Sequence, residues 1–142
     1  MAMTIPVWVL LAFAVWTMLV LMMTVGIYRW GMIFTGRAKV TDFSADGGEG
    51  SPLYQRAMRA HLNCLESLPV YGAIVLVIVV TGASNSTLDT LALVLISARM
   101  AQTLIHISTV QTAVIAYVRF GFFFTQLICM LWMAALLVQH AI

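Results

Sequence analysis

One stretch of the sequence sets charged and amide side chains at the edge of an apolar run that is long enough to enter a membrane. It covers residues 56–71 and reads RAMRAHLNCLESLPVY. On a helix, Arg59, Asn63 and Glu66 are spaced i, i+4 and i+7 and therefore share one narrow face, with Arg56 close by. A charged side chain at the centre of a membrane helix costs roughly 2.5–3.5 kcal/mol on insertion scales. Charges that are kept at this cost mark a candidate functional site.

A second polar set lies in another apolar stretch. Arg99, Gln102, Thr103 and His106 follow the spacing 0, 3, 4 and 7, so they also share one helix face. Arg99 lies more than one turn inside the stretch and is expected to face the bundle interior or a subunit interface. Two interpretations stay open: Arg99 binds a ligand, or it is a structural arginine paired with Glu66.

Arg119 lies near the start of the last apolar stretch. It is either a third inward-facing arginine or an interfacial cation that reaches toward the headgroups. If it faces inward, the site contains three arginines, Arg59, Arg99 and Arg119, and one carboxylate, that of Glu66. Its net charge is then positive. Guanidinium groups bind carboxylates through two parallel hydrogen bonds, and a nearby arginine lowers the pKa of a bound thiol. The residues therefore predict a site for a small anion that also carries amine or amide donors.

The composition shows which elements must position these residues. The chain has 142 residues, of which 63% are hydrophobic and 8% are charged, against about 25% charged in a soluble domain. Four apolar stretches reach, or can be extended to, the ~20 residues that cross a bilayer, and runs of this length exclude barrel strands. The prediction is an all-α integral membrane protein with one domain, 1–142. Its four-transmembrane-helix bundle covers about residues 5–28, 52–81, 87–108 and 112–139.

The basic residues predict the orientation of the chain. Five of the seven lie between the first and second apolar cores, namely Arg29, Arg37, Lys39, Arg56 and Arg59. The positive-inside rule then makes the connection over about residues 29–51 cytoplasmic and puts both termini on the opposite side. The net charge is only +2 and the basic residues are not gathered in an exposed patch, so no nucleic-acid partner is expected.

Several local patterns complete the prediction. Residues 41–50, TDFSADGGEG, lack periodicity and are typical of a flexible loop. Arg29 and Arg37 flank the start of this connection. They supply positive-inside charge, or one of them curls back to hold an anionic ligand. Ser51 with Pro52 is a helix start, and a residue among 85–87 can cap the third helix.

Other chemistries find no support in the residue spacing. No Ser/His/Asp or Cys/His arrangement is spaced for nucleophilic catalysis, and there is no glycine loop for phosphate. Cys64 and Cys129 have no metal-type spacing and are expected to be small packing residues. No metal site is predicted.

The second predicted helix, over about residues 52–81, carries a sequence motif that resembles the signature of a known family. The run Arg59-Ala60-His61-x-Asn63-x-x-Glu66-x-x-Pro69 resembles the signature of the MAPEG family, the membrane-associated proteins in eicosanoid and glutathione metabolism. The chain length, the four helices, the long first loop and an arginine in the third helix also match. The resemblance covers essentially the whole chain, while the specific motif occupies only the second helix.

The resemblance implies a homotrimer with glutathione, as co-substrate, bound between subunits near the cytoplasmic side. By position, Arg59, Asn63 and Glu66 would bind glutathione from the second helix and Arg99 from the third. Arg119 is similar to the family's arginine at the start of the fourth helix, which stabilises the glutathione thiolate. Gln102 stands where well-studied members carry Tyr or His, and His106 stands where they carry Tyr. Both are candidates to contact glutathione with different hydrogen bonds.

The implied function is a glutathione-dependent membrane transferase or peroxidase. The activated thiolate would attack a lipophilic electrophile or hydroperoxide drawn from the bilayer. The alternative is a MAPEG-fold membrane protein without glutathione catalysis, acting as a binding or scaffolding partner. A small multidrug exporter is disfavoured, because such exporters depend on a carboxylate in the first helix and residues 5–27 contain none.

Overall fold

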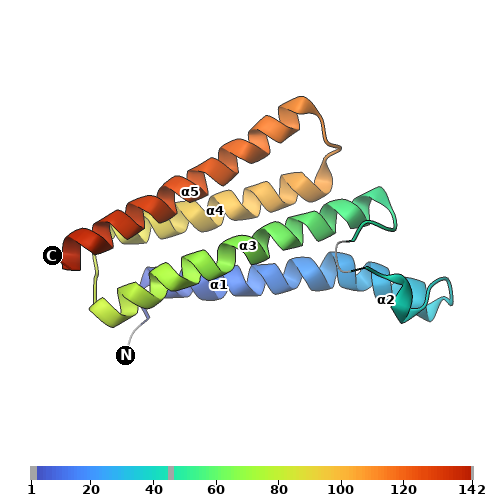
Figure 1. The fold of residues 1–142 in the computed structure, drawn as a ribbon, viewed down its shortest axis with the longest axis horizontal. Coiled ribbons are helices and arrows are strands. Elements are labelled where there is room, and N and C mark those ends of the chain that lie inside the picture. Colours follow the sequence, from blue (N-terminus) through green and yellow to red (C-terminus); the bar gives the residue numbers. More distant parts are fainter. Residues whose placement is uncertain (1–2, 45–46, 142) are drawn as a thin grey trace.

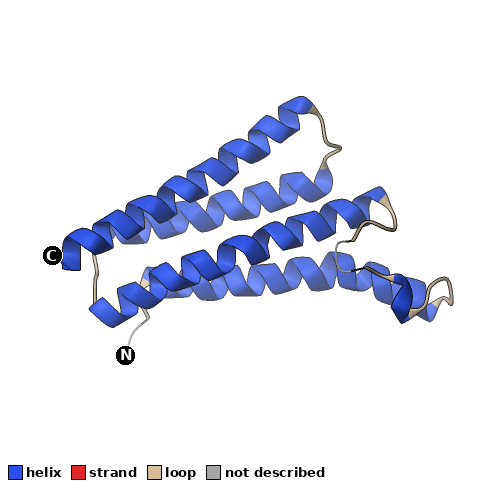
Figure 2. Ribbon diagram, viewed as in Figure 1, coloured by secondary structure: helices blue, strands red, loops and turns tan. Residues whose placement is uncertain are grey.

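The computed structural model describes residues 3–44 and 47–141 and consists of four long helical segments (Figures 1 and 2). The first segment joins α1 (Ile5–Val20), the π-helical turn η1 (Leu21–Gly26) and α2 (Ile27–Phe34). A short 3-10 turn, η2 (Val40–Asp42), follows in the first connection. The other segments are α3 (Pro52–Thr81), α4 (Ser86–Ser108) and α5 (Ala113–Ala141). All four are long and apolar enough to cross a membrane, which confirms the predicted four-helix membrane bundle.

The first helical segment is longer than predicted, and the first connection is correspondingly shorter. The helix continues past residue 28, where the sequence analysis ended it, and it stops at Phe34. Gly36 has φ +69°, and the amide of Arg37 donates to the carbonyl of Met32 over 2.9 Å. This left-handed glycine with a six-to-one hydrogen bond is a Schellman cap. Because the cap ends the helix, the connection begins at residue 35 instead of about 29.

The starts of α3 and α4 follow the predicted capping signals. The Ser51 hydroxyl accepts a hydrogen bond from the amide of Tyr54 over 3.2 Å, and Pro52 occupies the first helical position. The Asn85 side chain accepts from the amide of Leu88 over 2.9 Å. α3 continues through Pro69, for which the sequence predicts a kink or a freed carbonyl. α3 ends at Thr81. The residue that follows, Gly82, has a φ of +66°, which suits only glycine well.

Both chain ends and the α3–α4 connection lie at one end of the bundle (Figure 1). The described parts of the first connection, residues 35–44 and 47–51, and the α4–α5 connection lie at the other end, which is called the loop end below. In the same view, α5 diverges from α3 as it approaches the loop end.

The apolar core joins all four segments in the half of the bundle away from the loop end. Its fully buried members include Phe13, Tyr71, Leu95 and Met133, and the Tyr71 hydroxyl donates to the carbonyl of Pro6 over 3.0 Å. A smaller cluster near the loop end contains Val25, Tyr54, Ala57 and Met58. The outward helix faces carry large exposed apolar side chains, as lipid-facing surfaces do.

Candidate functional site

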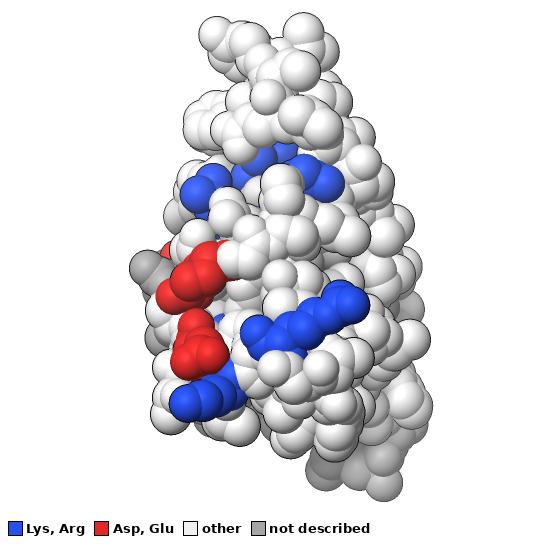
Figure 3. Space-filling view, turned by 90° about the vertical axis from the view of Figure 1, so that its right-hand side faces the viewer, with Lys and Arg blue, Asp and Glu red and all other residues white. Residues whose placement is uncertain are grey.

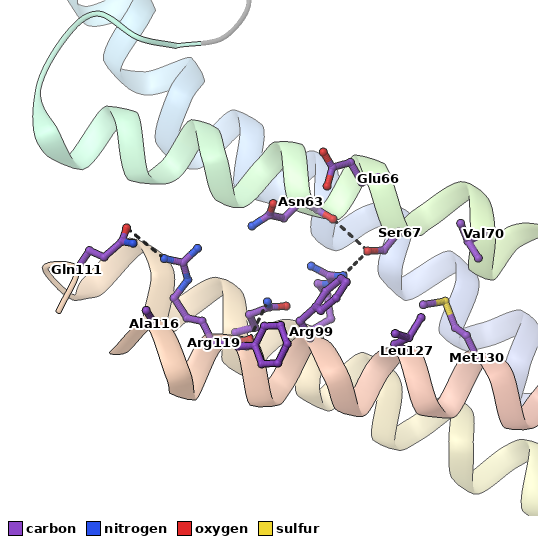
Figure 4. Close-up of a pocket in the computed structure, with 13 residues that line it drawn as sticks. Asn63, Glu66, Ser67, Val70, Arg99, Gln111, Ala116, Arg119, Leu127 and Met130 are labelled. Carbon is purple, nitrogen blue, oxygen red and sulfur yellow. Dashed lines mark hydrogen bonds between the residues drawn. The ribbon is translucent and has the colours of Figure 1, made fainter. Parts of the chain in front are cut away.

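A pocket of about 540 Å³ lies between α3, α4 and α5 (Figure 4). Its polar lining comes from all three helices and from the α4–α5 connection, and its apolar wall comes mostly from α5. The polar residues are Asn63, Glu66, Ser67, Arg99, Gln102, Gln111 and Arg119, and the apolar ones are Val70, Ala116, Phe120, Phe123, Leu127 and Met130. Gln111 and Ala116 lie toward the loop end, while Val70, Leu127 and Met130 lie deeper along the helices.

The pocket brings together five of the nine residues that the sequence analysis proposed for the site. These are Asn63, Glu66, Arg99, Gln102 and Arg119. The other four, Arg59, His106, Arg29 and Arg37, do not line it in the described chain. The polar set of α3 and the polar set of α4 thus meet in one pocket, because the two helices turn their polar faces toward it.

Arg99 is the most deeply buried charged residue of the pocket. It is 1% exposed, its Nη2 donates to the Ser67 hydroxyl, and its guanidinium carbon lies 5.6 Å from the centre of the Phe13 ring. Its Nε has no hydrogen-bond partner among the described residues. Glu66 is exposed and does not pair with Arg99 within the described chain, so the structural ion pair that the sequence allowed is not formed. A buried guanidinium with spare donors favours an anionic ligand.

Arg119 enters the pocket from the second turn of α5. Its side chain is partly buried, and its Nη1 lies 3.5 Å from Oε1 of Gln111, at the limit for a hydrogen bond. Its Nε is buried and lacks a partner in the part of the chain that the structure describes. Arg119 thus lines the pocket with a side chain that makes one long hydrogen bond among the described residues.

Gln102 lines the pocket but uses its amide on neighbouring helix atoms. Its Nε2 donates to the backbone carbonyl of Arg119 over 3.1 Å, and its Oε1 accepts from Gln126 over 3.0 Å. The side chain is buried. In this arrangement Gln102 ties α4 to α5 and keeps one N–H donor of Nε2 and one lone pair of Oε1 for a ligand.

Arg59 and His106 lie outside the pocket for different reasons. Arg59 is exposed on α3, one turn closer to the loop end than Asn63. His106 is buried on α4, one turn beyond Gln102. Neighbouring Arg56 is occupied locally, because its Nε donates to the carbonyl of Ile107 over 3.1 Å. Figure 3 looks onto the loop end, where Lys and Arg side chains lie beside Asp and Glu side chains.

Arg29 holds the first connection against α3. Its Nε donates to the Tyr54 hydroxyl over 2.7 Å, and its Nη2 donates to the carbonyl of Ser44 over 2.9 Å. Its guanidinium also lies over the rings of Phe43 and Tyr54, at 5.2 Å and 5.7 Å from their centres. Arg37 is exposed beyond the end of α2. In the single chain, Arg29 thus binds the connection and neither arginine reaches the pocket.

Replacing Arg29 with methionine should loosen this connection. The change removes two charge-assisted hydrogen bonds and both ring contacts, while a side chain of similar length remains. We expect trypsin to cleave after the exposed Arg37 or Lys39 at least about tenfold faster in this variant. Tyr54→Phe, which loses one of the two bonds, should show a smaller increase. Equal cleavage rates in all three proteins would contradict the clamping role.

Three polar residues near the site were given no role from the sequence. Ser67 and Gln111 contact the two pocket arginines, and Gln126 contacts Gln102. Gln126 could have been found, because an amide in an apolar membrane run is costly without a partner, and it lies seven residues after Arg119 on the same helix face. Ser67 and Gln111 carry no comparable sequence signal.

The geometry suits the binding of an anion from two sides. Arg99 on α4 and Arg119 on α5 supply positive charge, and Asn63 and Glu66 on α3 add an amide and a carboxylate to the lining. The apolar wall of α5 continues the pocket away from the polar end. Such a pocket can hold a polar, anionic molecule beside an apolar one.

The comparisons with known proteins agree with the sequence motif. The family model that describes the MAPEG family matches residues 6–139, which is nearly the whole chain. No curated protein and no solved structure matches the chain significantly. A match over this length, on a bundle of four membrane-length helices, establishes the family. The chain is a multi-pass integral membrane protein that belongs to the MAPEG family.

Proposed function

We propose that this protein is a glutathione-dependent transferase or peroxidase of the membrane. The observation that carries the proposal is the pair of arginines, Arg99 and Arg119, which line one pocket in a MAPEG chain and each have a buried Nε without a partner among the described residues. Glutathione is the co-substrate, and the second substrate is a lipophilic electrophile or hydroperoxide. The protein itself supplies no nucleophile.

The chemistry of glutathione fits the lining of the pocket. Glutathione carries two carboxylates, one ammonium group and one thiol. Arg99 would bind a carboxylate with two parallel hydrogen bonds, Glu66 would accept from the ammonium group, and Asn63 would bond to a peptide group. The pocket volume of about 540 Å³ lies within the range of ligand sites, roughly 300–1,000 Å³.

Catalysis would consist of thiol activation and positioning. Arg119 would lie beside the glutathione sulfur and stabilise the thiolate, which lowers the pKa of the thiol. In a transfer, sulfur forms a bond to carbon while the leaving group departs with its electron pair. In a peroxidase reaction, sulfur attacks the hydroperoxide, the O–O bond breaks, and the alkoxide takes up a proton. The resulting sulfenic acid condenses with a second glutathione to give the disulfide and water.

The assembly and orientation implied by the family are part of this proposal. In a homotrimer the pocket would lie between subunits, so Arg59, His106, Arg29 and Arg37, which do not line it in one chain, would remain candidates to complete it. The loop end would face the cytoplasm, where glutathione is available, and both termini would lie on the opposite side. The bilayer would deliver the lipophilic substrate along the apolar wall of α5.

One observation favours a second candidate, a glutathione-binding or scaffolding protein without catalysis. Gln102 occupies the place of a family tyrosine or histidine, and its amide is engaged by Gln126 and by the carbonyl of Arg119. Only one of the two N–H donors of its Nε2 therefore remains for a sulfur atom. In this alternative the anion site would persist while the thiol stayed protonated.

Titrating glutathione into the detergent-purified protein tests the proposal. We expect binding together with a thiolate absorbance band near 240 nm at neutral pH. S-methylglutathione, which has no ionisable thiol, is the matched control and should bind without the band. Binding of glutathione without a band would support the non-catalytic alternative. No binding of either compound would reject glutathione as the co-substrate.

A further inference from the structure

Gln126 is buried in α5 beside the pocket, is 1% exposed, and does not belong to the pocket lining. We propose that Gln126 is a positioning residue that sets the orientation of Arg119 through Gln102. The proposal rests on the proposed role of Arg119 in stabilising a thiolate. It assigns a function to a residue that touches no substrate.

The three residues form a continuous path of hydrogen bonds between α4 and α5. Nε2 of Gln126 donates to Oε1 of Gln102 over 3.0 Å and to the backbone carbonyl of Phe122 over 2.8 Å. Nε2 of Gln102 donates in turn to the backbone carbonyl of Arg119 over 3.1 Å. Both ends of the path are therefore backbone carbonyls of α5, three residues apart.

The carbonyl ends determine which way each amide must face. Nε2 of Gln126 lies beside two acceptors, so a reversed amide would put its oxygen against both of them. With Gln126 donating, Gln102 must present Oε1 to it, and only Nε2 of Gln102 is then left for the Arg119 carbonyl. The Phe122 carbonyl thus fixes the amide of Gln126, the Arg119 carbonyl fixes that of Gln102, and the bond between the two amides requires the same pair of orientations.

The hydrogen bond from Gln102 holds α5 near its start, close to Arg119. α5 diverges from α3 toward the loop end (Figure 1), and Arg119 lies in the second turn of α5, which begins at that end. The Arg119 side chain has one long hydrogen bond, to Gln111 at 3.5 Å, so its own contacts constrain it weakly. The direction of the guanidinium therefore depends on the rotation and tilt of the α5 backbone, which the bond from Gln102 restrains.

The cost of Gln126 also argues for a role. Its Oε1 is buried and has no hydrogen-bond partner within residues 3–44 and 47–141. Apolar side chains of similar volume, such as the methionines that follow in α5, would fill the same space without an unsatisfied atom. A purely packing role would not need an amide here.

Gln126→Met tests the proposal, because it keeps the volume and removes the donor. We expect the pKa of the thiol of bound glutathione to rise. The thiolate band at neutral pH should then fall roughly tenfold, with a similar fall in kcat. The dissociation constant of glutathione should change less than about threefold, because Arg99 and the α3 wall are untouched. Cys129→Ala, a buried change one turn further along α5, is the matched control and should leave the pH profile unchanged.

The outcomes separate positioning from simple helix packing. If Gln126 only joins helices, Gln126→Met should lower the Tm and weaken glutathione binding while the pH profile of the bound thiol stays unchanged. That result would overturn the proposal. A shifted pH profile with preserved affinity would support it.

If the wild-type protein shows no thiolate band, that result rejects the proposed function but does not test the role of Gln126. A second measurement tests that role independently of activity. A nitroxide attached to Arg119→Cys, in a background with Cys64→Ala and Cys129→Ala, reports the setting of this position in α5. Adding Gln126→Met should increase the mobility of the label. An identical spectrum with and without Gln126→Met would overturn the positioning role whatever the protein's activity.

Discussion

Replacing Arg119 with alanine is expected to remove the thiolate band of bound glutathione at neutral pH and to lower kcat by about 10²–10³-fold. The loss matches the removal of one preorganised donor from a developing or stored negative charge. Arg119 is partly buried and its Nε is unpartnered within the described residues, so it can place a bare charge beside sulfur. The affinity for glutathione should fall much less than kcat, because other residues of the pocket bind the rest of the tripeptide.

Arg119→Lys and Gln111→Ala are the matched controls for this prediction. Lysine keeps the charge but loses the planar fork, so it should retain part of the thiolate band. Gln111→Ala removes only the 3.5 Å contact to Arg119 and should leave most of the band. A full thiolate band in Arg119→Ala would show that Arg119 is an interfacial cation and that another group activates the thiol.

Replacing Arg99 with methionine is expected to weaken glutathione binding by about 10–100-fold without lowering the Tm. A hydrogen bond to a charged group contributes roughly 1.5–3 kcal/mol, and tenfold in affinity corresponds to about 1.4 kcal/mol. Arg99 is 1% exposed and forms no ion pair with Glu66 among the residues described. Replacing such a buried charge by an apolar side chain of similar length removes its desolvation cost, which is often neutral or stabilising.

The Arg99 prediction has its own contrasting variants. Ser67 keeps a partner when Arg99 is lost, because its hydroxyl also donates to the carbonyl of Asn63 over 3.2 Å. Ser67→Ala should therefore reduce affinity only modestly. Calorimetry with glutathione, paired with thermal unfolding in the same detergent, measures both quantities. A large fall in Tm with unchanged affinity would identify Arg99 as a structural residue.

The sequence by itself determined the four helices and two of their starts. Long apolar runs must form helices in a bilayer, because a helix satisfies its own backbone hydrogen bonds there. The caps at Ser51 and Asn85 depend on residues within one turn, so their sequence signals sufficed. The end of the first helix was misplaced because the basic residues from Arg29 onward were assigned to a connection, although the local signal at Gly36 was present.

The helical spacing also predicted much of the pocket, but only the tertiary structure selected its members. Periodicity says which residues share one face of one helix, and it correctly grouped Asn63 with Glu66 and Arg99 with Gln102. It could not say that Arg59 would lie outside the pocket. That outcome depends on how far α5 covers each turn of α3, which no pattern within α3 records.

The partners of the polar side chains were decided by the packing of one helix on another. Arg99 bonds to Ser67 and not to Glu66, one residue away, because the rotation of α3 about its axis turns Ser67 toward α4. Gln126 reaches Gln102, and Gln102 reaches the Arg119 carbonyl, because α4 and α5 lie in one particular register. Rotation and register are set by the fit of side chains between helices. They are properties of the assembled bundle and of no single stretch of the chain.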